Sequence, residues 1–394
     1  MLKESFLYLF ASLINAFFSF LLIPIYTSYL SVEEFGIYGF LIVINLVFYM
    51  LISGNLVNLL SREFYKSQKK YYYIYSIIFY FVLVFSFLGC VVYLFGEKML
   101  NFFEINVNVW YLYLILFIAF FRNVIDLYLS ILRFRFLAVE YLKFSVLISF
   151  LTALFSYVFL IKYKVIGIFE GILIGYFFIV LFIVVRNFRF LKFNGRFLKE
   201  VIKFSFSYMP TTLSWRVITL SDRFFITKMV GVNALGLYTL SYQLSSVFNL
   251  FTTSINQAFS PFFMKSLQEK RDIKRVVFFL IVGMGAILFV GYFILEFVIG
   301  FLKKDYYFAI DYIKWFLGIV FFSFLHSIFS KYMIFHKKEK IISIITTIGA
   351  VLNIGLNIVL IKLYGGIGAV VATLLVYIFI VLAEFIYIKR KNYV

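Results

Sequence analysis

The most unusual chemistry in this sequence is a pair of arginines, Arg216 and Arg223, inside the otherwise apolar stretch 205–230. Thr212, Arg216, Thr219 and Arg223 recur at i, i+4, i+7 and i+11, which predicts that they share one face of a helix. Arg216 would lie roughly 16 Å from the start of that helix, near mid-membrane. A guanidinium fork matches phosphate oxygens and stays charged, so this face favours a phosphate-bearing ligand in a wet cavity.

A structural interpretation of the arginines stays open. Arg216 would then pair with a carboxylate on another helix, while Arg223 would snorkel to the outer interface. Asp222 points about 100° away from Arg223 on an ideal helix, so local pairing is not expected. Asp222 is instead a candidate for ion coupling, and a proton-relay role for His326, Glu384 or Asp222 is a weaker alternative.

A second polar stripe runs along the stretch 235–262. Its hydroxyl and amide groups suit sugars or water in a cavity, although such groups also join neighbouring helices in membrane proteins. Because the stripe follows the arginine face in sequence, we interpret it as part of the same substrate-binding lining. Its members recur at offsets 0, 4, 7, 11, 14 and 18: Tyr242, Ser246, Asn249, Thr253, Asn256 and Ser260.

Other intramembrane polar residues have structural interpretations. Arg122 and Asp126 are four residues apart on one predicted helix and are expected to form a structural or gating pair. Asn353, Asn357 and His326 are expected to hydrogen-bond between helices.

Residues for other chemistry are sparse. Cys90 is the one cysteine, His326 and His336 are the two histidines, and no CxxC or HExxH pattern occurs, so no metal site is expected. No Walker A sequence, nucleophile elbow or paired-carboxylate loop is present. We therefore expect neither an enzyme nor a cofactor.

Composition explains why these polar residues stand out. The 394 residues are 64% hydrophobic and 14% charged, with a mean hydropathy of +1.03. Such a chain is a polytopic membrane protein rather than a soluble one. Reading for apolar runs of about 20 residues predicts an all-α protein with twelve spans: 5–30, 35–60, 71–95, 109–132, 143–163, 166–186, 205–230, 235–262, 276–302, 308–333, 341–362 and 366–388.

The net charge of +19 reflects membrane topology. Most basic residues fall in short clusters on the side that holds the N-terminus, which the positive-inside rule makes cytoplasmic. Both termini are then cytoplasmic, and no nucleic-acid partner is expected because no basic water-soluble module exists.

The sequence contains an internal duplication. An offset of 200 residues aligns the segment from Ser5 with the segment from Ser205 without a gap, pairing Gly36 with Gly236 and Tyr38 with Tyr238. An offset of 201 aligns the ends of the two halves. Six spans per half predict two parallel six-helix repeats around a central cavity. The expected domains are 1–186, a basic cytoplasmic linker 187–204, and 205–394.

Three segments carry a resemblance to a known family: YLFASLINAFFSFLLIPIYTSYLSVEEFGIYGF, SDRFFITKMVGVNALGLYTLSYQL and IKLYGGIGAVVATLL. In this order they resemble the polysaccharide transporters of the multidrug/oligosaccharidyl-lipid/polysaccharide flippase superfamily, the group that contains O-antigen flippases. Asp222 and Arg223 match the DR pair of that family. The pattern departs at Ser28, where the family often has a basic residue.

The resemblance implies a flippase for polyprenyl-pyrophosphate-linked oligosaccharide in the cytoplasmic membrane, working by alternating access in surface polysaccharide biosynthesis. The implied partners are the lipid-linked glycan and membrane lipids, with other polysaccharide-assembly proteins as further candidates. Two alternatives remain: a multidrug or cation exporter of the same superfamily, and an integral-membrane glycan polymerase or transferase.

Overall fold

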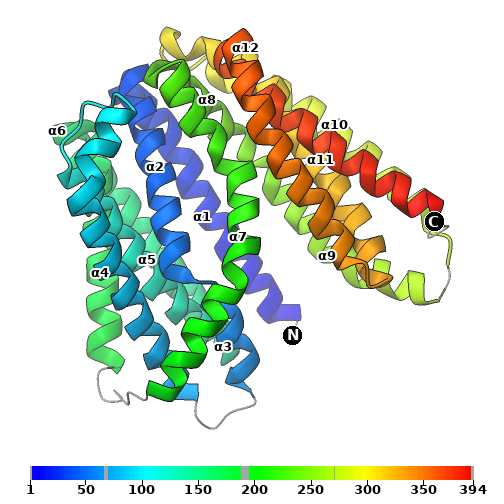
Figure 1. Ribbon diagram of the computed structural model, residues 1–394, viewed down its shortest axis with the longest axis horizontal. Helices are drawn as coiled ribbons and strands as arrows, with labels where there is room; N and C mark the ends of the chain where they lie inside the picture. The colour runs from blue at the N-terminus through cyan, green and yellow to red at the C-terminus, as the bar shows by residue number, and fades with distance from the viewer. Residues whose placement is uncertain (1, 66–69, 188–194, 270, 392–394) are drawn as a thin grey trace. The chain divides into compact units, whose positions relative to one another are not determined.

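The computed structural model describes residues 2–65, 70–187, 195–269 and 271–391, and this described part of the chain is helical without strands (Figure 1). The predicted all-α class is therefore confirmed. In chain order the elements are α1 (Leu2–Tyr29), α2 (Val32–Ser53), α3 (Leu56–Phe64), α4 (Lys70–Phe102), α5 (Trp110–Phe134), α6 (Ala138–Asn187), α7 (Gly195–Met229), α8 (Val232–Ser246), α9 (Phe248–Gln268), α10 (Lys274–Ile299), the 3₁₀-helix η2 (Lys304–Ala309), α11 (Ile310–Phe335) and α12 (Glu339–Arg390).

Two of these elements, α6 and α12, are each a pair of helices joined at one non-helical residue. Lys164 has φ 51° and ψ −126°, and Gly365 has φ 60° and ψ −142°. The orange and red halves of α12 fold back on each other in Figure 1. Both turns fall between spans that the sequence predicts as separate, and the two turn residues are 201 positions apart.

Close helix packing follows each turn. An added Cβ at Gly167 would meet the carbonyl of Phe159, and one at Gly368 would meet the carbonyl of Leu360. These contacts are equivalent under the same offset of 201 residues. Glycine lets the two antiparallel segments approach closely, as small residues do in membrane helix packing.

Eight segments of the described chain are long and apolar enough to cross a membrane. Two of them are the helix pairs α6 and α12, so they cover four of the twelve predicted spans. The predicted spans 205–230 and 235–262 correspond to α7 and to the α8–α9 pair, which are not among the eight. Their polar stripes lower the hydropathy of these segments.

Two predicted spans differ from the structure. The span 35–60 is divided by Gly54 and Asn55, which have φ of 51° and 58°, so α2 ends at Ser53 and the short α3 follows. The span 235–262 is divided at Val247 into α8 and α9. Each break spans only a few residues inside a longer predicted span, so hydropathy averaged over about 20 residues does not reveal it.

The chain forms two compact units. The first comprises residues 1–30 and 37–213, and the second comprises residues 31–36 and 214–394. In the first unit α6 packs on α1 and α5, and in the second α11 packs on α12 and α8. Of the predicted linker 187–204, residues 188–194 lie outside the described residues, and residues from Gly195 onward belong to α7.

A short segment of α2 belongs to the second unit. Ser31 and Glu34 form a capping box there: the Glu34 amide donates to Ser31 Oγ at 3.1 Å, and the Ser31 amide donates to Glu34 Oε2 at 2.8 Å. A Cβ at Gly36 would meet the Val232 carbonyl, and one at Gly236 would meet the Val32 carbonyl. The contact is reciprocal between positions that the duplication aligns.

Candidate functional site

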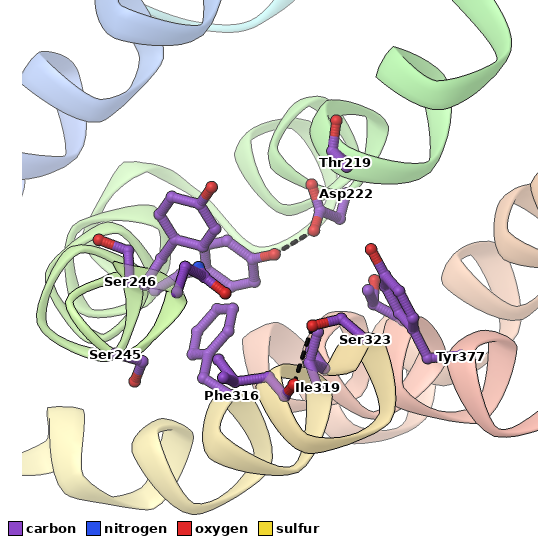
Figure 2. Close-up of a pocket in the computed structure, with 13 residues that line it drawn as sticks. Thr219, Asp222, Ser245, Ser246, Phe316, Ile319, Ser323 and Tyr377 are labelled. Atoms are coloured by element: carbon purple, nitrogen blue, oxygen red, sulfur yellow. Dashed lines mark hydrogen bonds between the residues drawn. The ribbon is translucent and has the colours of Figure 1, made fainter. Parts of the chain in front are cut away.

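The second unit contains a pocket that five of its helices line. Its volume is about 110 Å³, and its walls come from α7, α8, α9, α11 and α12 (Figure 2). Four residues of the predicted polar stripes meet there: Thr219, Tyr242, Ser246 and Asn249. The structure therefore brings part of both stripes to one place.

Asp222 supplies the carboxylate of this pocket and is 2% exposed. One carboxylate oxygen accepts the backbone N–H of Arg223 at 2.8 Å. The other accepts the hydroxyl hydrogen of Tyr238, from α8. Figure 2 shows Asp222 with Thr219 above it and Tyr377 to one side. Because both oxygens have donors, the carboxylate is held in place.

Arg223 lies beside this pocket and is 4% exposed. Its guanidinium carbon is 4.3 Å from the ring centre of Tyr242 and 5.9 Å from that of Tyr238. A cation over an aromatic face gains electrostatic stabilisation when both are desolvated. Nε of Arg223 is buried and has no hydrogen-bond partner among the described residues. The side chain therefore neither snorkels nor faces open water in this structure.

Arg216 has different surroundings. Its side chain is half-buried, and it forms no ion pair with any described residue. Its backbone carbonyl accepts a long, 3.4 Å hydrogen bond from Thr219. The carboxylate partner that the structural interpretation requires is thus not found in the part of the chain that the structure describes.

The remaining stripe residues lie elsewhere. Thr212 lines a small cavity of the first unit with Met50, Gly54, Asn55 and Met209. Thr253 donates to backbone carbonyls of its own helix, at Asn249 and Leu250.

Asn256 makes interhelical bonds instead of lining the pocket. Its Oδ1 accepts from Lys331 Nζ at 2.6 Å and from Ser327 Oγ at 2.9 Å, both on α11. The far end of the predicted stripe therefore hydrogen-bonds to a neighbouring helix, which is the alternative role of such residues in membrane proteins.

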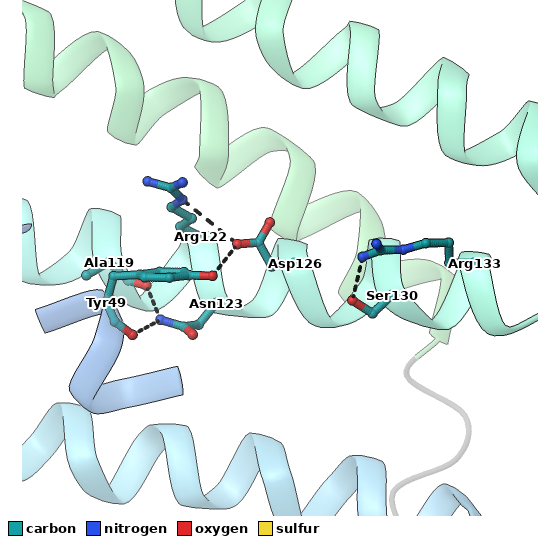
Figure 3. A network of polar contacts seen from close by, with 7 residues as sticks. All are labelled: Tyr49, Ala119, Arg122, Asn123, Asp126, Ser130 and Arg133. Carbon is teal, nitrogen blue, oxygen red and sulfur yellow. Dashed lines mark hydrogen bonds and ion pairs between the residues drawn. The ribbon is translucent and has the colours of Figure 1, made fainter. Parts of the chain in front are cut away.

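The first unit contains its own cluster of an arginine, an aspartate and a tyrosine (Figure 3). Arg122 Nε lies 3.8 Å from Asp126 Oδ2, which also accepts from the Tyr49 hydroxyl at 2.8 Å. The Arg122 guanidinium carbon lies 4.7 Å from the Tyr49 ring centre. Asn123 ties the same two helices by donating to the Tyr49 carbonyl at 3.1 Å. The Arg122–Asp126 pair that the spacing predicts is therefore present, and a gating role for this pair stays a prediction.

Comparison with known families decides the identity of the chain. The family described as "polysaccharide biosynthesis protein" matches residues 1–267. The chain belongs to this family. A comparison with curated protein sequences gives no match.

Solved structures of membrane transporters share the fold of this polysaccharide biosynthesis family protein. The lipid II flippase MurJ in an inward closed conformation aligns with a TM-score of 0.75 and 19% identity, covering 99% of this chain and 88% of that one. An inward-facing multidrug resistance MATE family transporter aligns with a TM-score of 0.70 and 13% identity, covering 95% and 94%. The Vibrio cholerae MATE transporter VcmN aligns with a TM-score of 0.61 and 13% identity, covering 100% and 97%. The protein therefore has a multi-pass membrane transporter fold.

Several contacts in this family member are not predicted from its sequence. Tyr238, Phe316, Tyr377 and Thr373 line the pocket together with the expected residues. Tyr238 carries one signal, because the duplication pairs it with Tyr38. Phe316 and Tyr377 are single aromatic residues among many in apolar spans, so no spacing marks them.

Two buried polar networks lie in the second unit, and one of them includes the pocket residue Thr373. Asn357 donates to Asn353 Oδ1 at 2.9 Å, and Asn353 donates to Thr373 Oγ1 at 3.3 Å. His326 Nδ1 lies 3.0 Å from Glu384 Oε2, and Glu384 is fully buried. The described residues contain no cluster of three or more His, Cys, Asp or Glu side chains that could hold a metal ion.

Proposed function

We propose that this protein is a flippase that moves polyprenyl-pyrophosphate-linked oligosaccharide across the cytoplasmic membrane for surface polysaccharide biosynthesis. The family supplies the biosynthetic context, and the fold is one that a lipid II flippase uses. The observation that carries the proposal is Arg216, a half-buried cation inside a membrane protein with no carboxylate partner among the described residues. An intramembrane arginine without a protein partner favours an anionic ligand.

In this proposal the pyrophosphate binds Arg216, and Arg223, about two helical turns further along the same face, adds to the positive potential. The polar residues Thr212, Thr219, Tyr242, Ser246, Asn249, Thr253 and Asn256 then serve the glycan or its water shell, directly or through their helices. The isoprenoid tail stays in the bilayer. Neutralising the pyrophosphate lowers the cost of carrying it across the apolar core.

The membrane potential also favours this direction of transport. An anion moving outward across an inside-negative membrane gains about 2.3 kcal/mol per charge per 100 mV. Asp222 is the candidate for coupling to an ion. We further propose that the halves 1–186 and 205–394, joined by the basic linker 187–204, alternate access to the substrate, with both termini in the cytoplasm.

The test is mass spectrometry of the lipid that stays bound to gently purified protein. Wild type should retain a polyprenyl-pyrophosphate glycan, and Arg216→Ala should lose most of it. Arg275→Ala is a charge-matched control, because Arg275 is exposed near the start of α10. Bulk phospholipid alone in wild type and both variants contradicts the proposal.

Export of a cationic drug is a second candidate function. The aromatic pocket with the carboxylate of Asp222 favours it, and the MATE family transporters share the fold. Cation-driven efflux from vesicles, unaffected by lipid-linked glycan, would support this candidate over the flippase.

A further inference from the structure

The pocket of the second unit has four aromatic walls. The rings of Tyr238, Tyr242, Phe316 and Tyr377 line it, and Phe316 meets Tyr238 and Tyr242 edge-on at 4.9 and 5.7 Å between ring centres. Aromatic side chains have few rotatable bonds, so they offer a large apolar contact surface to the face of a ligand ring at low cost in conformational entropy.

Two polar groups on this wall lack partners within the described chain. The side-chain amide of Asn249 and the hydroxyl of Tyr377 make no hydrogen bond with any described residue. An amide offers two donors and an acceptor, and a phenol offers one donor and one acceptor. A ligand with several hydroxyl groups could satisfy both.

One buried charge of each sign lies at the pocket. Asp222 lines it, with both carboxylate oxygens already accepting hydrogen bonds, and the guanidinium of the buried Arg223 lies over the ring of Tyr242, which also lines it. A metal cation would compete with these donors, and a phosphate would meet the carboxylate. The charge balance therefore favours an uncharged, polar ligand.

The size of the pocket narrows the ligand further. Its volume of about 110 Å³ is several times the roughly 10–15 Å³ that one water requires. It is smaller than the roughly 300–1,000 Å³ of a site for a drug-sized molecule. A pocket of this intermediate volume suits a ligand the size of a single sugar ring. A whole oligosaccharide is too large for it.

We infer that this pocket binds one uncharged sugar residue of the transported glycan, with the ring against Tyr242 and its hydroxyls bonded to the side-chain amide of Asn249 and the hydroxyl of Tyr377. This inference rests on the proposed flippase function and deepens it. It assigns recognition of the glycan to the second unit and separates it from recognition of the pyrophosphate by Arg216.

Saturation-transfer NMR on the full chain in lipid nanodiscs tests the inference. Nanodiscs are needed because the sugar headgroups of maltoside detergents would compete for the pocket. The probes are the methyl glycosides of glucose, galactose and N-acetylglucosamine, together with methyl glucuronide as an anion and tetramethylammonium as a cation. At least one uncharged glycoside should receive saturation, and the two ions should not.

Two variants separate the pocket from the rest of the chain. Asn249→Ala combined with Tyr377→Phe removes both unpartnered groups and should weaken glycoside binding about tenfold, the effect of losing roughly 1.4 kcal/mol. Tyr364→Phe is the control, since Tyr364 lies directly before the turn at Gly365 in α12, is 64% exposed and does not line the pocket. Tyr377→Phe alone removes one oxygen atom and keeps the test usable if the double variant unfolds.

Each other result contradicts the inference in a distinct way. Absence of saturation on all three uncharged glycosides overturns it. Glycoside binding by the Asn249 and Tyr377 variants that equals binding by wild type also overturns it. Binding of tetramethylammonium alone would assign the pocket to cations. If wild type still retains a polyprenyl-pyrophosphate glycan that Arg216→Ala loses, the flippase proposal stands even when the sugar pocket fails.

Discussion

The guanidinium of Arg223 lies 4.3 Å from the ring centre of Tyr242, on the helix after its own. Its neighbour in sequence, Asp222, accepts a hydrogen bond from Tyr238, one helical turn before Tyr242. The two charges thus share one buried site and use two tyrosines of α8. Each charge makes the burial of the other less costly.

Replacing one of these charges should destabilise the protein. Arg223→Gln leaves the carboxylate of Asp222 buried without its neighbouring cation, which should lower the free energy of unfolding by about 3–5 kcal/mol. Adding Asp222→Asn should recover part of that loss. Thermal unfolding in detergent measures both effects, with the exposed Arg275→Gln as control. Purely additive losses in the double variant would show that the charges do not interact.

The reciprocal contact of Gly36 and Gly236 should tolerate no added methyl group. Gly36→Ala places a Cβ against the Val232 carbonyl, and such overpacking costs about 1–3 kcal/mol. Gly283→Ala is the matched control, because a Cβ there meets nothing within 4 Å and alanine favours the helix by about 1 kcal/mol. Equal melting temperatures for the two variants would contradict the close contact.

The sequence predicts most helices but only part of the site. Long apolar runs mark spans, and periodicity correctly places Thr219, Tyr242 and Asn249 on surfaces that meet. Periodicity cannot say what a face contacts, so it does not reveal that Arg223 stacks on Tyr242. That contact depends on how two helices pack, which is a tertiary property. The break at Gly54 has a local signal, the turn-forming residues Ser53, Gly54 and Asn55, which a search for apolar runs of about 20 residues passes over.

Comparison of the turn residues of α6 and α12 predicts that glycine substitutions at two nearby lysines, Lys164 and Lys162, change the stability in opposite directions. Lys164 has φ 51° and ψ −126°, a sparsely populated conformation that costs a non-glycine residue about 1–3 kcal/mol, whereas its equivalent Gly365 is free of that cost. Lys164→Gly should therefore raise the free energy of unfolding by about 1 kcal/mol. Lys162→Gly, inside the helix, should lower it by a similar amount. Chemical denaturation of the two variants compares them directly, and a loss of stability in both would contradict the strain at Lys164.

The orientation in the membrane can be tested with single cysteines, because Cys90 is the chain's only native one. In a Cys90→Ser background, Lys303→Cys and Lys340→Cys place thiols at exposed positions before and after α11. The distribution of basic residues puts position 340 in the cytoplasm and position 303 outside. A membrane-impermeant maleimide should therefore label position 303 in intact cells and position 340 only after permeabilisation. Equal labelling after permeabilisation controls for thiol reactivity, and labelling of position 340 in intact cells would reverse the proposed topology.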